Sequence, residues 1–113
     1  MEIIGLKWLK FDQNKRLVKG KNFFDFDEKA IAALEGDFSL KCKSVNEILL
    51  ANAAGAKYLI IDKSNDELIK KAVNLAEFYM FDSKIACIIP DISMLEKMAN
   101  LGVDAVFIGE NLD

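Results

Sequence analysis

The chain has 113 residues, 52% of them apolar and 29% charged, with one Pro, six Gly and a net charge of -3. This composition predicts one soluble globular domain over residues 1–113 and excludes a flexible linker. No apolar run approaches the roughly 20 residues that span a bilayer. The first residues resemble neither a signal peptide nor a transit peptide, so we expect a cytoplasmic protein with no membrane partner.

The absence of histidine excludes several kinds of chemistry. The chain has no His, and its two cysteines, Cys42 and Cys87, stand far apart in short apolar runs. A Ser–His or Cys–His nucleophile and a His/Cys zinc site are therefore excluded, and both thiols are expected to be buried and reduced. We expect no catalytic activity from this chain alone and no cofactor.

The charges are distributed unevenly along the chain. Residues 1–43 hold nine Lys or Arg and seven acids, whereas residues 44–113 hold six and eleven. A basic segment with aromatic neighbours is typical of a nucleic-acid surface. Lysines also keep edge strands from aggregating, and we prefer this interpretation, which requires no nucleic-acid partner.

The first elements in chain order are two apolar runs, residues 5–11 and 16–24, on either side of a turn-like segment, residues 12–15. This pattern predicts an N-terminal hairpin within residues 1–26. A helix is expected next, begun by Asp25 or Asp27 and closed by Gly36.

Helical and strand-like segments alternate through the remainder, residues 27–113. Strands are predicted at residues 38–43, 57–62, 84–89 and 104–109. Three of these runs are apolar at nearly every position, which indicates parallel strands covered on both faces. We therefore predict an α/β three-layer sandwich of the flavodoxin or receiver kind, ββα-βαβαβαβ, with a mainly parallel central sheet.

Three helices are predicted to begin with one motif. Ser44–Glu47, Ser64–Glu67 and Ser93–Glu96 have the Ser-x-x-Glu spacing of a capping box, in which hydroxyl and carboxylate satisfy free backbone N–H groups. Gly55 and Gly102 are predicted to close the first and the third helix. The serines are thus interpreted as caps rather than nucleophiles.

The middle helix, about Asn65 to Phe81, is apolar over more than half of its circumference, and Phe78 widens that face. A helix that packs on one sheet face needs a narrower apolar stripe. We therefore expect a homo-oligomer, or contact with another protein, through this helix. The leading hypothesis is an interaction or regulatory module, a homodimer without catalytic activity of its own.

Residues 57–109 resemble the later part of response-regulator receiver domains, with an apolar strand that ends on Asp62. Asp62 matches the Asp that this family phosphorylates. Ile89–Pro90 and Gly109–Glu110 stand where the family has a Ser or Thr and a Lys. The resemblance implies an open parallel sheet in which the phosphotransfer residues are incomplete.

Residues 84–111, and above all LGVDAVFIGE at 101–110, resemble the closing units of phosphate-binding (βα)8 barrels such as indole-glycerol-phosphate synthase. In that family a Gly in the position of Gly109 lets backbone N–H groups approach a phosphate. The partner loop reads Pro90–Ser93 here and contains Asp91. Because the chain is too short for eight βα units, the resemblance implies at most a half-barrel.

Ligands of open parallel sheets bind beyond the C-terminal ends of the strands. Three acids are expected there: Asp62, Asp91 and Glu110. Together they would bind Mg²⁺ or Ca²⁺, or one of their carboxyl groups would have a raised pKa and act as a general acid or base. The residues predicted to hold a small phosphorylated ligand are Lys43, Ser44, Lys63, Ser64 and Gly109. A degenerate receiver-like or half-barrel domain that binds such a metal or ligand is the alternative functional hypothesis. The simpler interpretation is that the acids cap helices.

Overall fold

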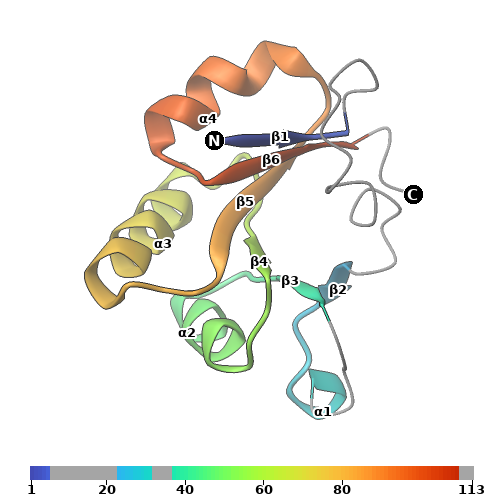
Figure 1. The fold of residues 1–113 in the computed structure, drawn as a ribbon, viewed down its shortest axis with the longest axis vertical. Helices are drawn as coiled ribbons and strands as arrows, with labels where there is room; N and C mark the ends of the chain where they lie inside the picture. The colour runs from blue at the N-terminus through green and yellow to red at the C-terminus, as the bar shows by residue number, and fades with distance from the viewer. Residues whose placement is uncertain (6–22, 32–36, 110–113) are drawn as a thin grey trace.

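The computed structural model describes residues 1–5, 23–31 and 37–109. The elements in chain order (Figure 1) are β1 (Glu2–Ile4), β2 (Phe23–Asp25), α1 (Glu28–Ile31), β3 (Ser39–Lys41), α2 (Val45–Ala53), β4 (Tyr58–Ile60), α3 (Asp66–Tyr79), β5 (Lys84–Ile89), the 3-10 helix η2 (Ile92–Met94), α4 (Leu95–Leu101) and β6 (Ala105–Ile108). No helix in these ranges is long and apolar enough to cross a membrane.

Within the described residues, six strands form one parallel sheet in the order β1-β6-β5-β4-β3-β2. The predicted α/β class with a parallel central sheet is confirmed. From β2 to β6 each strand is added beside the one before it, and β1 then pairs with β6, Glu2 opposite Ala105. This strand order differs from the flavodoxin-like order 2-1-3-4-5, in which the chain reverses direction across the sheet. Strands that are added in one direction are instead typical of successive units in a (βα) barrel.

The predicted N-terminal hairpin falls mostly on residues 6–22, which lie outside the described part of the chain. Its described ends are β1 and β2. They lie at opposite edges of the sheet, and each pairs in parallel with a different strand, β1 with β6 and β2 with β3.

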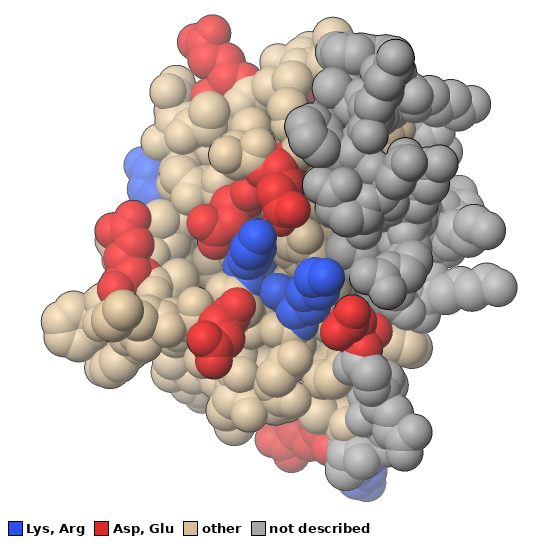
Figure 2. All heavy atoms as spheres, in the orientation of Figure 1, with Lys and Arg blue, Asp and Glu red and all other residues tan. Residues whose placement is uncertain are grey.

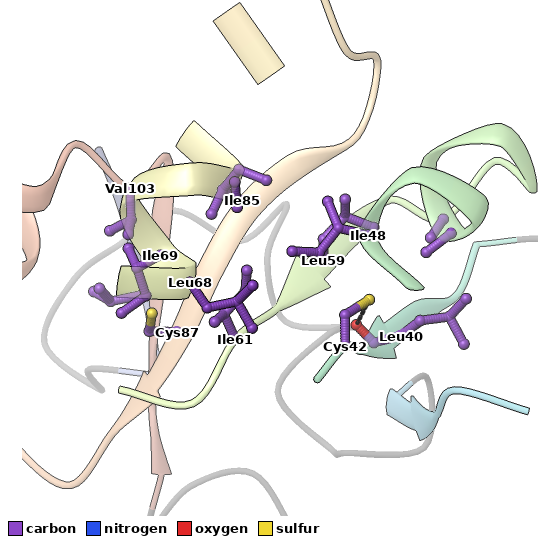
Figure 3. Packing of buried hydrophobic residues seen from close by; sticks show 14 of the residues in the cluster. Leu40, Cys42, Ile48, Leu59, Ile61, Leu68, Ile69, Ile85, Cys87 and Val103 are labelled. Carbon is purple, nitrogen blue, oxygen red and sulfur yellow. Dashed lines mark hydrogen bonds between the residues drawn. The ribbon is translucent and has the colours of Figure 1, made fainter. Parts of the chain in front are cut away.

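The described helices pack on one face of the sheet. Right-handed crossovers that advance in one direction place successive helices on the same side. Figure 1 shows α2, α3 and α4 along one side of a curved sheet, and Figure 3 shows strand side chains between the sheet and the helices. The fully buried residues of this cluster include Leu40, Leu59, Ile61, Ile85, Cys87 and Val106 from the strands and Ile48, Ala51, Ile69, Ala72 and Met98 from the helices.

The opposite face of the sheet is buried as well. Its cluster consists of strand residues, none more than 5% exposed: Ile4, Tyr58, Ile60, Ala86, Ala105 and Phe107. The rings of Tyr58 and Phe107 meet edge to face with their centroids 5.1 Å apart. Burial of both faces confirms what the apolar strands predicted.

The sheet curves strongly toward this second face. Glu2 on β1 and Tyr58 on β4 are separated by β6 and β5, which is roughly 14 Å in a flat sheet with about 4.8 Å between strands. Side chains that stand perpendicular to a flat sheet do not meet over that distance. Yet the Tyr58 hydroxyl donates to Glu2 Oε1 at 2.8 Å, and Lys84 Nζ lies 3.3 Å from the same oxygen. The described strands therefore form part of a barrel-like wall, with the helices outside.

Only one of the three predicted serine caps is confirmed. Ser44 Oγ accepts from Glu47 N at 3.2 Å, and the Glu47 carboxylate accepts from Lys43 N at 2.8 Å. α3 instead begins at Asn65, whose side-chain oxygen accepts from Leu68 N at 3.1 Å. The serine cap is thus confirmed for α2 alone, and the carboxylate of Glu47 bonds the backbone N–H of Lys43 rather than that of Ser44, which a capping box requires.

The predictions for Ser64 and Ser93 were wrong because an Asp stands two residues before each. Asp62 accepts from Ser64 N at 2.9 Å and from its hydroxyl at 2.7 Å. Asp91 accepts from Ser93 N at 2.9 Å and from its hydroxyl, and begins η2. A short Asp side chain that closes its own turn competes with capping by the serine.

Of the three glycines predicted to close helices, Gly55 and Gly102 are described, and Gly36 lies outside the described residues. Gly55 and Gly102 adopt left-handed backbone angles, with φ of 88° and 85°, and confirm the predicted ends of α2 and α4. α3 ends at Tyr79, two residues before the predicted end, and Met80 takes the left-handed conformation with φ of 52°. At α1, Asp27 rather than Asp25 is the cap, because it accepts from Lys29 N at 3.0 Å.

Candidate functional site at the C-terminal strand ends

An open pocket of ≈ 480 Å³ lies at the C-terminal ends of β2, β3 and β4. Three lysines and two acids line it, together with apolar side chains: Lys41, Lys43, Lys63, Asp25 and Asp62. Figure 2 shows basic side chains at the centre of this view, where Figure 1 shows β3 and β4, with acidic side chains around them. The volume falls within the range of about 300–1,000 Å³ that small ligands occupy.

Two residues of this pocket, Lys41 and Asp25, were missed by the sequence analysis. Asp25 on β2 is opposite Lys41 on β3, and Lys41 is opposite Ile60 on β4. Ile60 belongs to the second, inner face of the sheet. Lys41 and Asp25 therefore point toward the inside of the curved wall at the strand ends, which is where (βα) barrels place their ligand-binding residues.

A signal for Lys41 was present in the sequence. Leu40 lies in the cluster under the helices, so the neighbouring Lys41 must face the other side, because successive strand residues alternate. A charge in that position, within a sheet covered on both faces, marks the place where a strand leaves the core. Lys41 lies within its strand-like run rather than after it, unlike Lys43 and Lys63.

The lysines of the pocket form no ion pair within 4.0 Å with another described residue, although Lys63 is close enough to Asp62 for its charge to lower the pKa of that acid. Among the described residues, the ion pairs within 4.0 Å are Lys71–Glu67, Lys84–Glu2 and Lys97–Asp66. Lys41, Lys43 and Lys63 are in none of them. Their ammonium groups are therefore available to an anion that enters the pocket.

Asp62 and Asp91 are held as carboxylates. The bonds from Ser64, first its backbone N–H and then its hydroxyl, lower the pKa of Asp62, and the charge of Lys63 adds to this. The hydroxyl of Ser93 and then its backbone N–H lower the pKa of Asp91. The hypothesis of a raised carboxyl pKa is therefore wrong for these two acids, since hydrogen bonds to the charged form favour ionisation.

The predicted metal ligands are Asp62, Asp91 and Glu110. The first two follow β4 and β5 and are engaged with their own serines. Glu110 lies outside the described residues. In the part of the chain that the structure describes, no three side chains of His, Cys, Asp or Glu form a group that would hold a metal ion. The metal site stays a prediction.

Of the five residues predicted to hold a phosphorylated ligand, Lys43 and Lys63 line the pocket. Ser44 caps α2, and Ser64 is bound to Asp62. Gly109 follows β6, where an added Cβ would lie 3.2 Å from the backbone oxygen of Ile89. The neighbouring strand by itself therefore explains the glycine.

The two cysteines are buried, as predicted, and both are free thiols. Burial, the main cause, raises the pKa of Cys42 and of Cys87 to about 12. Cys42, which also borders the pocket, is 3% exposed, and its sulfur lies 3.6 Å from the Leu40 carbonyl oxygen (Figure 3). A protonated, covered thiol is a packing residue rather than a nucleophile.

A scan of the chain against models of protein families and a search of curated proteins both find no match. Function is therefore inferred from the pocket itself, where three lysines at two adjacent strand ends of a curved parallel sheet form no ion pair with another described residue.

Proposed function

We propose that this protein binds a small phosphorylated molecule in the pocket at the C-terminal strand ends. The observation that carries the proposal is the meeting of Lys41, Lys43 and Lys63 at one pocket. Lysine is a compact cationic donor that binds phosphate as a point charge. No catalytic residue is proposed.

The acids of the pocket do not cancel these charges. Asp62 directs an oxygen to Ser64, and Asp25 is the other acid on the lining. Among the described lining residues, three cations and two anions leave a net positive charge, which attracts the negative charge of a phosphate monoester. The curved wall and the one-directional winding support the same location, because (βα) barrels bind ligands at this end.

A ligand titration tests the proposal. Inorganic phosphate and pyrophosphate are added at constant ionic strength while thermal unfolding is followed. A ligand that binds the folded state raises the unfolding midpoint in a saturable way. Lys43→Ala and Lys63→Ala should each weaken binding about tenfold, since a hydrogen bond to a charged group contributes about 1.5–3 kcal/mol.

The matched control is Lys57→Ala, which removes a lysine just before the N-terminal end of β4 and should leave phosphate affinity unchanged. No saturable rise with either anion, or an equal loss in all three variants, would contradict the proposal. Titration with Mg²⁺ and Ca²⁺ separates the metal alternative. A rise at millimolar metal that Asp62→Asn abolishes would favour a metal site instead.

A second candidate function, a self-associating interaction module, is favoured by a separate observation. Phe78, Tyr79 and Met80 at the end of α3 are 79%, 62% and 84% exposed. Consecutive large apolar side chains with this exposure are typical of a contact surface. For either function we propose a cytoplasmic location.

A further inference from the structure

The side of α3 that faces away from the sheet carries a regular exposed surface. This surface, the α3 face, consists of residues three or four positions apart, all of them exposed: Glu67, Lys70, Lys71, Asn74, Glu77 and Phe78. On the opposite side of the helix, Ile69 and Ala72 are 0% exposed. The α3 face therefore takes no part in the packing of the described core.

The charges of the α3 face are arranged asymmetrically along the helix. Lys70 and Lys71 lie in its middle, whereas the last turn has no basic residue and contains Glu77. The C-terminal carbonyl groups of a helix carry partial negative charge that a nearby cation stabilises. At the end of α3 an acid adds to that charge instead, so this end attracts cations from elsewhere.

Within the chain, the lysines of the α3 face are only weakly engaged. Lys71 Nζ lies 3.1 Å from Glu67 Oε1, with side chains 56% and 81% exposed. Such a pair in solvent contributes little. Lys70 is in no ion pair with another described residue.

We propose that two copies of this chain associate through antiparallel α3 faces centred on Asn74. A two-fold axis there places Glu77 of each copy beside Lys70 of the other, and Phe78 along the aliphatic part of Lys71. The lysines of one copy then lie near the negatively charged end of the other helix. This self-complementarity identifies a second copy as the occupant, because a two-fold interface uses the same surface twice.

Phe78 has an aromatic neighbour on its own helix. Its ring meets that of Tyr79 edge to face, with centroids 4.8 Å apart and planes at 88°. Two helices of this length bury less than the roughly 1,200 Å² of a standard interface, so the dimer should be weak, with a Kd on the order of 10–100 µM.

Sedimentation equilibrium from about 5 to 500 µM tests this pairing, since that range brackets the expected Kd. The unaltered protein should pass from monomer to dimer. Phe78→Lys should weaken association at least tenfold, because it replaces an apolar contact with a cation that faces Lys71 of the other copy, and Glu77→Lys should weaken it by like-charge repulsion with Lys70. Combining Glu77→Lys with Lys70→Glu should restore it, since the swapped charges meet again across the axis.

The control is Ile92→Glu, which changes a 55% exposed apolar residue on η2 and should leave association unchanged. Circular dichroism and the thermal midpoint confirm that each variant is folded. A protein that remains monomeric at 500 µM, or a dimer that Phe78→Lys does not affect, would overturn the proposal. A dimer that the charge swap fails to restore would overturn the antiparallel arrangement. None of these results depends on phosphate binding.

Discussion

At the scale of single residues, Met80 holds the end of α3 in a backbone conformation that its side chain disfavours. Its φ of 52° lies in the left-handed region, where Gly55 and Gly102 also lie at the ends of the other two long helices. A residue with a Cβ is disfavoured there by roughly 1–2 kcal/mol. The Met80 side chain is 84% exposed, so packing does not offset this strain.

Met80→Gly should therefore raise the free energy of unfolding by about 1 kcal/mol, because glycine enters this conformation without the Cβ clash. Urea denaturation measures the change. Gly55→Ala is the converse control. It should lower stability by about 1 kcal/mol through backbone strain alone, since an added Cβ meets nothing within 4 Å. A loss of stability in Met80→Gly would show that contacts of the methionine side chain stabilise the fold by more than the left-handed backbone conformation destabilises it.

The helix caps show how far single residues could be predicted. The sequence places Asp62 and Asp91 two positions before Ser64 and Ser93, whereas Cys42 precedes Ser44 at that distance. A carboxylate bonds the serine hydroxyl and backbone, and a thiol does so only weakly. The turns that compete with serine capping could therefore have been predicted from the Asp two residues before the serine. The Ser-x-x-Glu motif alone does not distinguish a serine that caps a helix from one that an Asp binds.

At the scale of elements, the hydrogen bond between Glu2 and Tyr58 joins two strands that do not pair with each other. Tyr58 is 1% exposed, and its hydroxyl reaches across β5 and β6 to the carboxylate on β1. Ala86 and Ala105, which occupy the same face between them, are small enough to leave that path open. The bond thus joins the edge strand β1 to β4 across the inner face of the curved sheet.

Removing this hydroxyl should destabilise the fold. Tyr58→Phe should lower the free energy of unfolding by about 1–2 kcal/mol, because a hydrogen bond to a charged group is lost. Glu2→Ala should cost about as much, since it leaves a buried hydroxyl without its partner. Chemical denaturation of both variants and of the double variant gives the coupling. If the double variant loses as much free energy of unfolding as the two single variants together, the two residues are not coupled, and this would contradict the hydrogen bond.

Element types were predictable because they depend on local pattern, whereas strand order was not. The run at 84–89 matches β5, and those at 38–43, 57–62 and 104–109 each contain a shorter observed strand. Which strands pair depends on contacts between distant segments, and β1 beside β6 is the extreme case. The site residues also differ in whether a local pattern or a contact between distant segments reveals them. Lys43 and Lys63 follow apolar runs and could be found, and alternation along its strand indicates the face of Lys41, whereas Asp25 requires the register between β2 and β3.

At the scale of the whole molecule, both faces of the sheet bury groups that ionise at high pH. Cys42 and Cys87 lie beneath the helices, and Tyr58 lies on the inner face. Burial raises the pKa of each thiol from 9.0 to about 12. Burial, followed by the hydrogen bond and the charge of Glu2, raises the pKa of Tyr58 as well.

The protein should therefore lose stability in alkali. The unfolded chain releases these protons first, so stability is fully present below pH 9 and falls as pH rises toward 12, by about 1.4 kcal/mol per pH unit for each thiol. Urea denaturation between pH 7 and about 10.5 measures how steeply the free energy of unfolding falls with pH. This pH range brackets the point at which ionisation of the thiols begins to lower stability. Cys42→Ala with Cys87→Ala should flatten it. An unchanged slope in that variant would assign the loss to other groups.

The pairing of β1 with β6 has a consequence for how the chain acquires its structure during synthesis. Every other neighbouring pair joins consecutive strands and can form as soon as its segment leaves the ribosome. The first strand, in contrast, must wait for Ala105 to emerge before Glu2 finds its partner. This pairing closes the loop from Glu2 to Ala105, whose entropic cost exceeds that of any consecutive strand pair, so we expect it to form after the other pairs of described strands.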